Sequence, residues 1–479
     1  MKRIIAVLLL LCMSLAVLAS CKKDEASTDD STANSEQAWN DGLPDVDMGG
    51  YEFNILSYNS EWFEWAEIAL APSSEDSMGN MLYEEMYKRN VALEDRFGFF
   101  FKVTTQKNIA QQDIEKLALG GDNTYDMVMY YDKWSMACAQ YFRDWNECEY
   151  IDLSQDYWNP SITSNFEYND KQFAISGNFS LSMLSRTDVM LFNKEMFKNF
   201  HGDVETIYNM VKEDKWTLEE MYTYAAAVVD DDDGQAGDEG TYGITGSKKH
   251  YYTSIMVGCD IDFTKIAKDG SVVFTLPTDT SAKDKIEQIM AYNQGNNIHY
   301  DSSDNIDYHA PETMFEDGKS LFCTKNIFFI PSTRAAMETE FGILPMPKYD
   351  TNQEEYINSC DGGDVACLLA TVPESDLENI GIIMEAWSAH SQQTLVPLYQ
   401  EELIKTRYSS DLQSYEMLTL IFQTSYASGG LGGINADPIM RQLVTDYFIK
   451  DGTQELASLL QRMNPSVKAA IKTVLQGVE

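Results

Sequence analysis

The sequence predicts an α/β fold with largely parallel sheets. Short apolar runs of the strand type alternate with helical segments along most of the chain, as crossover connections between parallel strands require. The chain has 479 residues, which exceeds the usual length of one domain, and its 44% of hydrophobic residues can fill sizeable cores. We therefore expect two or three domains of the α/β class.

The first elements form a strand–helix–strand series. Residues 51–56 alternate apolar and polar side chains, as a strand does. Residues 80–97 carry apolar side chains at helical spacing and end at Gly98, a typical C-cap. A strand at 99–104, a helix at 109–119 and a short apolar strand at 125–131 are then expected to follow.

Later segments repeat this alternation with more helix. Thr217 and Glu220 have the spacing of a capping box and predict a helix from 217 to about 229. Further elements are expected as helices at 280–293 and 376–390, a strand at 341–347, and mostly helix from 396 onward. The middle of the chain mixes predicted strands with helices, whereas its last third is rich in predicted helices. We therefore expect domains built from non-contiguous pieces of chain.

The N-terminus carries an export signal. Lys2 and Arg3 precede an apolar run at 4–18, which is too short to span a bilayer and is typical of a secretory signal. The end of this signal, Leu-Ala-Ser before Cys21, resembles the lipobox of bacterial lipoproteins. This implies a signal peptide at 1–20 and acylation of Cys21 with palmitate-type chains. Ordinary secretion, with Cys21 a plain thiol, is the alternative. Residues 21–48 are polar and predict a disordered tether.

The charge excludes one large class of partners. There are 76 acidic and 35 basic residues, a formal net charge of −41. Such a field repels phosphate backbones and anionic lipid heads, so we expect no nucleic-acid partner and no electrostatic membrane docking. Otherwise this charge mainly keeps a protein soluble.

The cysteines form no metal or redox motif. Six lie beyond Cys21, and none has the C-x-x-C spacing. An extracellular location permits disulfides, and Cys138/Cys148 and Cys360/Cys367 are the sequence-near pairs. Sequence does not choose among the pairings, and buried free thiols fit equally well.

Aromatic and carboxylate residues follow several predicted strands. A sugar stacks its C–H face on an aromatic ring and hydrogen-bonds its hydroxyls to carboxylates and amides. Ligands of parallel sheets bind beyond the carboxyl ends of the strands. Candidate binding residues at these positions are Glu61, Trp62, Trp65, Asp132, Trp134, Asn178, Asp361 and Asp364. The alternative for each tryptophan is packing in a core or between domains.

The acidic loop Asp230 to Asp238 suggests calcium but fits it poorly. With Gly234 at position six of an EF-hand loop, Val229 falls where the first carboxylate is needed and Gly240 where the bidentate glutamate is needed. A solvated acidic turn is the simpler interpretation. The sequence contains no H-E-x-x-H, phosphate-binding P-loop or G-x-S-x-G motif, so we expect no metal, no cofactor and no catalytic residues.

A set of segments in fixed order carries a family resemblance. The segments are YKRNV at 87–91, LEDRF at 93–97, GDNTYDMV at 121–128, WNECEYIDL at 145–153, YWNP at 157–160, LFNK at 191–194, WTLEE at 216–220, TYG at 241–243, FEDGK at 315–319, FGILPMPKY at 341–349, QEEY at 353–356 and EAWS at 385–388. In this order they resemble the carbohydrate-type (family 1) extracellular solute-binding proteins of bacterial ABC importers, in the lipoprotein branch of Gram-positive bacteria.

The resemblance implies a two-lobe, periplasmic-binding-protein-like fold of type II. Lobe one would hold residues 49–165 and 340–392, and lobe two residues 170–338 and 395–479. The chain would cross between the lobes near 161–168, 338–341 and 391–396, forming a multi-strand hinge. The ligand would lie in the cleft between the lobes, which would close around it.

The resemblance also implies the function. We expect a monomeric receptor, lipid-anchored at the extracellular face of the cell membrane, that captures a sugar, either an oligosaccharide or a glycoside, and delivers it to the permease of an ABC importer. Two alternatives stay open. A secreted glycoside hydrolase needs only two suitably spaced carboxylates, and a sensor subunit would present bound sugar to a signalling partner.

Overall fold

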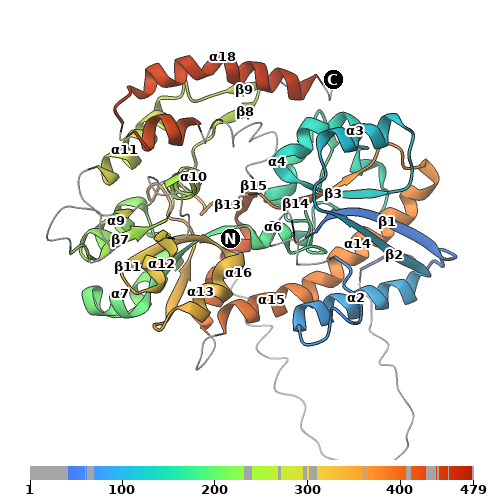
Figure 1. Cartoon of the computed structure of the whole chain (residues 1–479), viewed down its shortest axis with the longest axis horizontal. Coiled ribbons are helices and arrows are strands. Elements are labelled where there is room, and N and C mark those ends of the chain that lie inside the picture. Colours follow the sequence, from blue (N-terminus) through green and yellow to red (C-terminus); the bar gives the residue numbers. More distant parts are fainter. Residues whose placement is uncertain are drawn as a thin grey trace, which may run out of the picture. The chain divides into compact units, whose positions relative to one another are not determined.

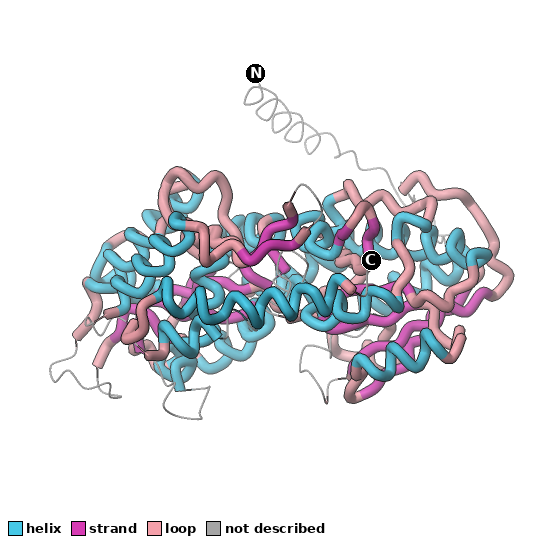
Figure 2. Tube along the Cα trace, turned by 90° about the horizontal axis from the view of Figure 1, so that it is seen from above, coloured by secondary structure: helices cyan, strands magenta, loops and turns pink. Residues whose placement is uncertain are grey.

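The computed structural model describes residues 41–59, 61, 70–230, 240–246, 248–267, 271–294, 299–300, 310–360, 362–405, 411–427, 439, 442–450 and 452–476. Residues 43–479 form one compact unit, to which the following description refers. The expected signal peptide, Cys21 and most of the tether lie outside the described residues. Within the unit, Figure 1 shows two sheets in different halves, and Figure 2 shows helices on both sides of the strands.

The first sheet has the strand order β14-β3-β1-β2. Its strands are β1 (Tyr51–Tyr58), β2 (Phe99–Gln106), β3 (Met127–Tyr131) and β14 (Asp364–Leu368). β1 pairs in parallel with β2 and β3, whereas β14 runs antiparallel to β3 with Asp364 opposite Tyr131. The edge at which β1, β2 and β3 end is therefore the edge at which β14 begins.

The second sheet has the strand order β10-β7-β11-β6-β12. Its strands are β6 (Asp188–Asn193), β7 (Tyr242–Thr245), β10 (His299–Tyr300), β11 (Ser320–Asn326) and β12 (Phe341–Leu344). β6 is buried along its whole length and runs antiparallel to β11 and β12, while β7 is parallel to β10 and β11. Asn326, the last residue of β11, lies opposite Asp188, the first of β6.

The pairing of β12 bears on one predicted boundary. Residues from 340 onward were expected in lobe one, whereas Phe341–Leu344 pairs with β6 in the second sheet. The chain rejoins the first sheet only at β14, after β13 (Asn358–Cys360), which pairs in parallel with β15 (Ser425–Ala427). A short, fully buried apolar strand fits either sheet equally well, so sequence could not assign it. The lobe boundaries stay predictions.

Smaller strands complete the β structure. They are β4 (Glu167–Tyr168) with β5 (Lys171–Gln172), and β8 (Thr264–Ile266) with β9 (Val272–Phe274). With their antiparallel members, the two large sheets are mixed, not purely parallel as a simple alternation of strands and helices predicts.

Helices cover the sheets and connect them. The α-helices are α2 (Met81–Phe97), α3 (Gln111–Leu119), α4 (Asp132–Ser135), α5 (Pro160–Thr163), α6 (Ser182–Ser185), α7 (Lys194–His201), α8 (Glu205–Lys212), α9 (Leu218–Ala226), α10 (Lys248–Gly258), α11 (Thr280–Asn293), α12 (Ala310–Glu316), α13 (Ile330–Ala336), α14 (Leu377–Gln393), α15 (Leu395–Ile404), α16 (Leu412–Gln423) and α18 (Leu456–Leu475). Short 3-10 and π turns are η2 (Met136–Tyr141), η3 (Trp145–Glu147), η4 (Asp156–Trp158), η5 (Ser164–Phe166), η6 (Ile327–Phe329), η7 (Glu374–Asp376) and η9 (Val444–Phe448). None of the described helices is long and apolar enough to cross a membrane.

The predicted capping residues explain where two helices begin and end. The Asn80 side chain accepts hydrogen bonds from the backbone N–H groups of Leu82 and Tyr83 at the start of α2. Gly98 ends this helix with φ at 65°, a left-handed conformation that favours glycine. The Thr217 hydroxyl accepts from the backbone N–H of Glu220 at 3.4 Å at the start of α9.

The cysteines of the described residues are free and buried. Burial raises the pKa of the Cys138 thiol to about 11 and that of Cys148 to about 12. These thiols are protonated at neutral pH and act as small apolar side chains, the second of the two interpretations that the sequence left open.

A buried arginine joins α2 to α14. Arg89 is 1% exposed and donates hydrogen bonds to the carbonyl of Phe179 at 3.1 Å, the hydroxyl of Ser391 at 2.8 Å and the carbonyl of Leu70 at 3.2 Å. Its guanidinium lies 5.2 Å from the centre of the Trp387 ring. Burial lowers its pKa to about 9, so the group stays charged at neutral pH and is held by neutral acceptors.

We predict that Arg89→Met destabilises the fold strongly. The substitution keeps much of the side-chain volume but leaves buried acceptors without their donor, which should lower the free energy of unfolding by about 3 kcal/mol. Urea denaturation measures the change. Lys88→Met is the matched control, because Lys88 on the same helix is exposed and forms only an i,i+4 ion pair with Glu84. Equal shifts of the urea midpoint in both variants would contradict the structural role of Arg89.

Candidate functional site

The two sheet edges meet at Arg186, just before β6. Arg186 is 9% exposed, and its Nε donates to the carbonyl of Gly362 at 3.3 Å, two residues before β14 begins. Its own carbonyl accepts from Nδ2 of Asn326 at 3.2 Å, at the end of β11. One residue thus contacts the carboxyl edge of both sheets, which is where α/β proteins bind ligands.

A fixed set of polar groups lies around Asp188 on the second-sheet side. Asp188 is fully buried, and its carboxylate accepts hydrogen bonds from Nδ2 of Asn326 and, at 2.5 Å, from the hydroxyl of Ser254. Nε2 of His250 lies 3.0 Å from the same carboxylate. His250 and Ser254 stand four residues apart on α10 and therefore on one face of that helix.

Asp364 is the counterpart on the first-sheet side. It is 6% exposed at the start of β14, and its backbone N–H donates to the Ser182 hydroxyl at 2.9 Å. Burial raises the pKa of its carboxyl to about 7, although Ser182 and the charge of Arg186 act in the opposite direction. Oδ1 of Asp364 has no hydrogen-bond partner within the described part of the chain. The carboxyl can therefore change charge near neutral pH.

We call Arg186, Asp188, Asn326 and Asp364 the strand-edge cluster. Three of the predicted binding residues lie beside it or in it. Asp132 and Trp134 are on α4 directly after β3, where the backbone N–H of Asp132 donates to the carbonyl of Gly363 at 3.0 Å. Asp132 is buried, and Trp134 is partly exposed with its ring edge-on to Tyr131 at 5.0 Å. The structure brings Asp132, Trp134 and Asp364 to one edge, while their role in binding stays a prediction.

The other candidates lie elsewhere or outside the described residues. Glu61 is exposed beyond the end of β1 and forms an ion pair with Lys107 at 3.3 Å. Trp62, Trp65 and Asp361 lie outside the described residues. Nδ2 of Asn178 donates to Oε1 of Gln392 on α14.

Two expectations about local structure were wrong. Asp364 was expected in a loop, but it is the first residue of β14, and it reaches the edge because this strand is antiparallel to β3. Asn178 was expected directly after a predicted strand, but the preceding strand, β5, ends at Gln172. Beyond it only an isolated bridge pairs Ile175 with Ala366, so Asn178 does not follow a strand of either large sheet.

Sequence reasoning missed most of the strand-edge cluster. Arg186 and Asp188 come directly before the apolar run 189–192, and Asn326 ends the apolar strand β11. The rule that points to the carboxyl ends of parallel strands applies only to residues that follow a strand. Residues that precede an antiparallel strand reach the same edge, and polar residues on both flanks of an apolar run were the available signal.

The structure gives no support for a metal site in the residues it describes, where no three metal-binding side chains come together. Asp230 forms paired backbone hydrogen bonds with Thr241, at 3.2 and 3.1 Å. The rest of the acidic loop that suggested calcium lies outside the described residues.

Comparison with known proteins agrees on the fold. No protein-family model matches the sequence, and a search of curated proteins finds no match. Among solved structures, an ABC substrate-binding protein from Listeria monocytogenes in complex with cycloalternan is 11% identical, with a TM-score of 0.53, 88% of this chain covered and 99% of the other. The protein UspC of M. tuberculosis is 12% identical with a TM-score of 0.57, and a cyclic alpha-maltosyl-1,6-maltose binding protein from Arthrobacter globiformis is 13% identical with a TM-score of 0.56. In both, 88% of this chain and 100% of the other are covered.

These similarities establish the class of fold. The chain has the two-lobe α/β fold of the binding proteins of ABC transporters, as expected from the sequence. Within this fold, the carboxyl edges of the two large sheets meet at Arg186.

We predict that Asp364→Asn changes the pH dependence of stability. The folded-state pKa of about 7 exceeds the ordinary 3.8, so folding favours the protonated carboxyl. The stability that Asp364 contributes is present below the ordinary pKa and is lost as pH rises to about 7. Asparagine does not ionise. The melting temperature of the variant minus that of the wild type should therefore increase from about pH 5 to about pH 8.

Asp122→Asn provides the control. Hydrogen bonds from Thr124 lower the pKa of the exposed Asp122 carboxyl, so this group is ionised in both states over the same pH range. Its difference in melting temperature should stay constant. A constant difference for Asp364→Asn as well would show that Asp364 is not protonated in the fold.

Proposed function

We propose that this protein is an extracellular sugar receptor that delivers its ligand to the permease of an ABC importer. The observation that carries the proposal is the shared fold, which spans 88% of this chain and nearly all of each solved binding protein. One of those proteins is in complex with cycloalternan, and another is a cyclic alpha-maltosyl-1,6-maltose binding protein. An oligosaccharide or glycoside is accordingly the proposed ligand class.

The strand-edge cluster has chemistry suited to this role. Oδ1 of Asp364 can accept a hydrogen bond from a sugar hydroxyl and Arg186 can donate to ring or hydroxyl oxygens, while the buried Asp188 and Asn326 hold the surrounding groups in place. Trp134 supplies a partly exposed aromatic surface beside them. The work of such a site is binding, because a receptor of this fold acts by closing its lobes around the ligand.

We place the receptor at the outer face of the cell membrane, held there by a lipid on Cys21. The export signal and the lipobox-like residues before Cys21 support this, and the polar stretch that follows gives the reach of a tether. A net charge of −41 argues against electrostatic attachment to anionic lipids.

A glycan screen tests the proposed function. A sugar present at one hundred times its Kd should stabilise the protein by about 2.7 kcal/mol, which a thermal-shift panel detects. Small-angle scattering should then show a smaller radius of gyration with that sugar, and the sugar should be recovered intact. Trp134→Ala should weaken binding at least several-fold, because stacking on one ring contributes about 1 kcal/mol.

Trp216→Ala is the matched control for the tryptophan. Trp216 is fully buried and donates to the carbonyl of Pro345, so its loss should cost about 3–5 kcal/mol of stability. If Trp134→Ala behaves in the same way and leaves affinity unchanged, Trp134 is a packing residue. If the purified protein hydrolyses the sugar and one carboxylate substitution abolishes this activity, the protein is a glycoside hydrolase and not a receptor. If a sugar stabilises the protein but the protein has no permease partner, the result favours the sensor subunit of a signalling system.

We predict that Cys21→Ser releases the protein from the membrane. Without the thiol no lipid can be attached, and the tether has no other means of holding the protein. Metabolic labelling with palmitate and fractionation measure the effect, with Cys138→Ser as the control because Cys138 is buried in the fold. Unchanged label and membrane retention in the Cys21 variant would refute the anchor.

A further inference from the structure

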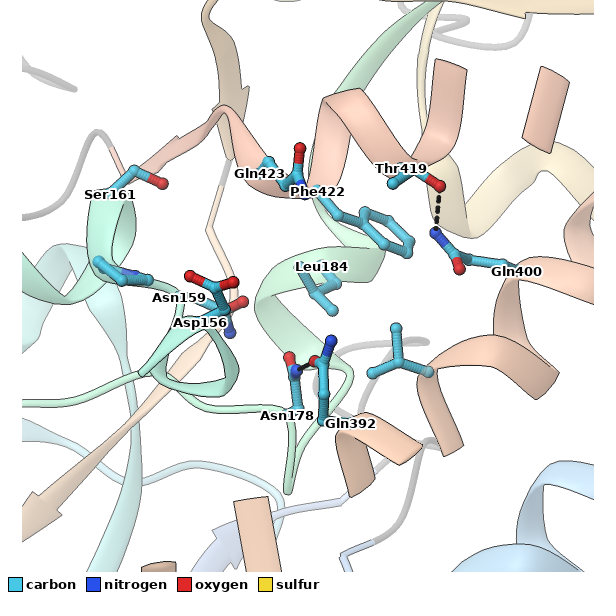
Figure 3. A pocket seen from close by; sticks show the side chains of 12 residues that line it. Asp156, Asn159, Ser161, Asn178, Leu184, Gln392, Gln400, Thr419, Phe422 and Gln423 are labelled. Atoms are coloured by element: carbon cyan, nitrogen blue, oxygen red, sulfur yellow. Dashed lines mark hydrogen bonds between the residues drawn. The ribbon is translucent and has the colours of Figure 1, made fainter. Parts of the chain in front are cut away.

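A pocket lies among the segments that connect the two sheets. It has a volume of about 430 Å³, within the range of small-molecule sites. One wall comes from η4 and α5, and the opposite wall from α15 and α16. Figure 3 shows Asn159 and Asp156 facing Phe422 and Gln423 across this space, with Gln392 and Asn178 below.

Helix α6 separates this pocket from the strand-edge cluster. Ser182 on α6 accepts a hydrogen bond from the backbone of Asp364, whereas Leu184 lines the pocket. Two residues along a helix differ by about 200°, so these side chains leave α6 on nearly opposite sides. The pocket is therefore distinct from the site where we propose that the transported sugar binds.

The lining combines neutral hydrogen-bonding groups with one aromatic ring. Its carboxamides are Asn159, Asn178, Gln392, Gln400 and Gln423, and its ring is Phe422. Gln400 is positioned by a hydrogen bond of 3.4 Å from its Nε2 to the Thr419 hydroxyl (Figure 3). Carboxamides both donate and accept, so they match hydroxyl groups, which do the same.

The charge of the lining excludes ionic ligands. Asp156 is the single charged residue among the residues that line the pocket, and no lysine or arginine is among them. An anion would meet a carboxylate without a compensating cation, in a protein of strongly negative net charge. One exposed carboxylate is also too few for a metal cation. A neutral ligand fits best.

Asn178 gives independent support for a ligand. Its side chain is 3% exposed, and its Oδ1 accepts no hydrogen bond from the part of the chain that the structure describes. An enclosed acceptor without a donor costs about 1–3 kcal/mol. Its Nδ2 donates to the exposed Gln392, which leaves Oδ1 for another donor. Because Asn178 lines the pocket, a ligand there can supply that donor.

We infer that this pocket, which we name the amide pocket, is a second binding site for a small neutral polyhydroxyl molecule of mono- or disaccharide size. A hydroxyl of the ligand donates to Oδ1 of Asn178, while Gln400 and Gln423 bind further hydroxyls. Phe422 contacts the C–H face of the ligand. The inference does not rest on the proposed role of the strand-edge cluster.

Saturation-transfer NMR with D-glucose and maltose tests the inference. We expect a signal from at least one of these sugars at millimolar concentration with the full-length folded protein. Gln400→Leu removes one carboxamide, and Gln423→Trp fills the pocket from an exposed position on α16. Each variant should lose at least four-fifths of the signal, while circular dichroism checks that it is folded.

Trp134→Ala distinguishes the amide pocket from the strand-edge cluster. This variant changes only the proposed main site, so the signal should persist in it if the sugar occupies the amide pocket. Loss of the signal in Trp134→Ala together with its retention in both pocket variants would overturn the inference. Absence of any signal from either sugar would overturn it as well. Neither result depends on the outcome of the glycan screen, which measures tight binding and lobe closure.

Discussion

The segments that carry the strand-edge cluster and the amide pocket depend on the polar face of one buried helix, α14. Glu385 on this helix accepts hydrogen bonds from Nε1 of Trp158 at 2.9 Å, from the backbone of Asp152 at 3.1 Å and from the hydroxyl of Tyr157. Burial raises the pKa of this carboxyl, and the three donors act against that shift. Two of these three donors, Tyr157 and Trp158, belong to η4, a turn of three residues that is part of no sheet. The buried carboxylate therefore fixes the position of η4.

The same helix positions the segment that leads to α6. The hydroxyl of Ser388 accepts from the backbone of Phe179 at 3.4 Å, and Ser391 and Trp387 contact Arg89. Gly177 lies so close to Ser388 and Trp158 that a Cβ atom at this position would overlap both side chains. Glycine is therefore required there by close approach, although its φ is not left-handed. The contacts of α14 thus fix the direction in which the chain enters α6.

Sequence predicted what depends on local pattern and missed what depends on pairing between distant segments. The helix starts at Asn80 and Thr217, and the helix end at Gly98, follow from hydrogen bonds within a few residues. The assignment of β12 to the second sheet depends on β6, about 150 residues earlier, and no local signal encodes it. The position of Asp364 depends likewise on the antiparallel direction of β14.

The candidate site shows the same division. Asp132 and Trp134 could be predicted because a parallel strand presents the residues that follow it at the ligand-binding edge. Arg186 and Asp188 could not be found by that rule, because they precede an antiparallel strand. The amide pocket was beyond sequence altogether. Its walls come from segments as far apart as Asp156 and Gln423, and neutral amides scattered over that distance form no motif.

Helix α6 connects these features, since Ser182, Leu184 and Arg186 follow one another at intervals of two residues. Ser182 binds the first residue of β14, Leu184 lines the amide pocket, and Arg186 contacts both sheet edges. Ser182 and Arg186, four residues apart, lie on one face of this segment and Leu184 on the nearly opposite face, so the segment cannot rotate without changing its contacts on both faces. If the lobes move relative to each other, the movement must therefore either carry α6 as a rigid part of one lobe or break the contacts of Arg186. On the first-sheet side, α6 is held by the hydrogen bond from the backbone of Asp364 to Ser182 and by the close approach of Gly363 to Met183. Arg186 continues into β6 of the second sheet, and Asn326 contacts both its carbonyl and Asp188, so the hydrogen bond from Nε of Arg186 to the carbonyl of Gly362 is the contact that joins this segment to the start of β14.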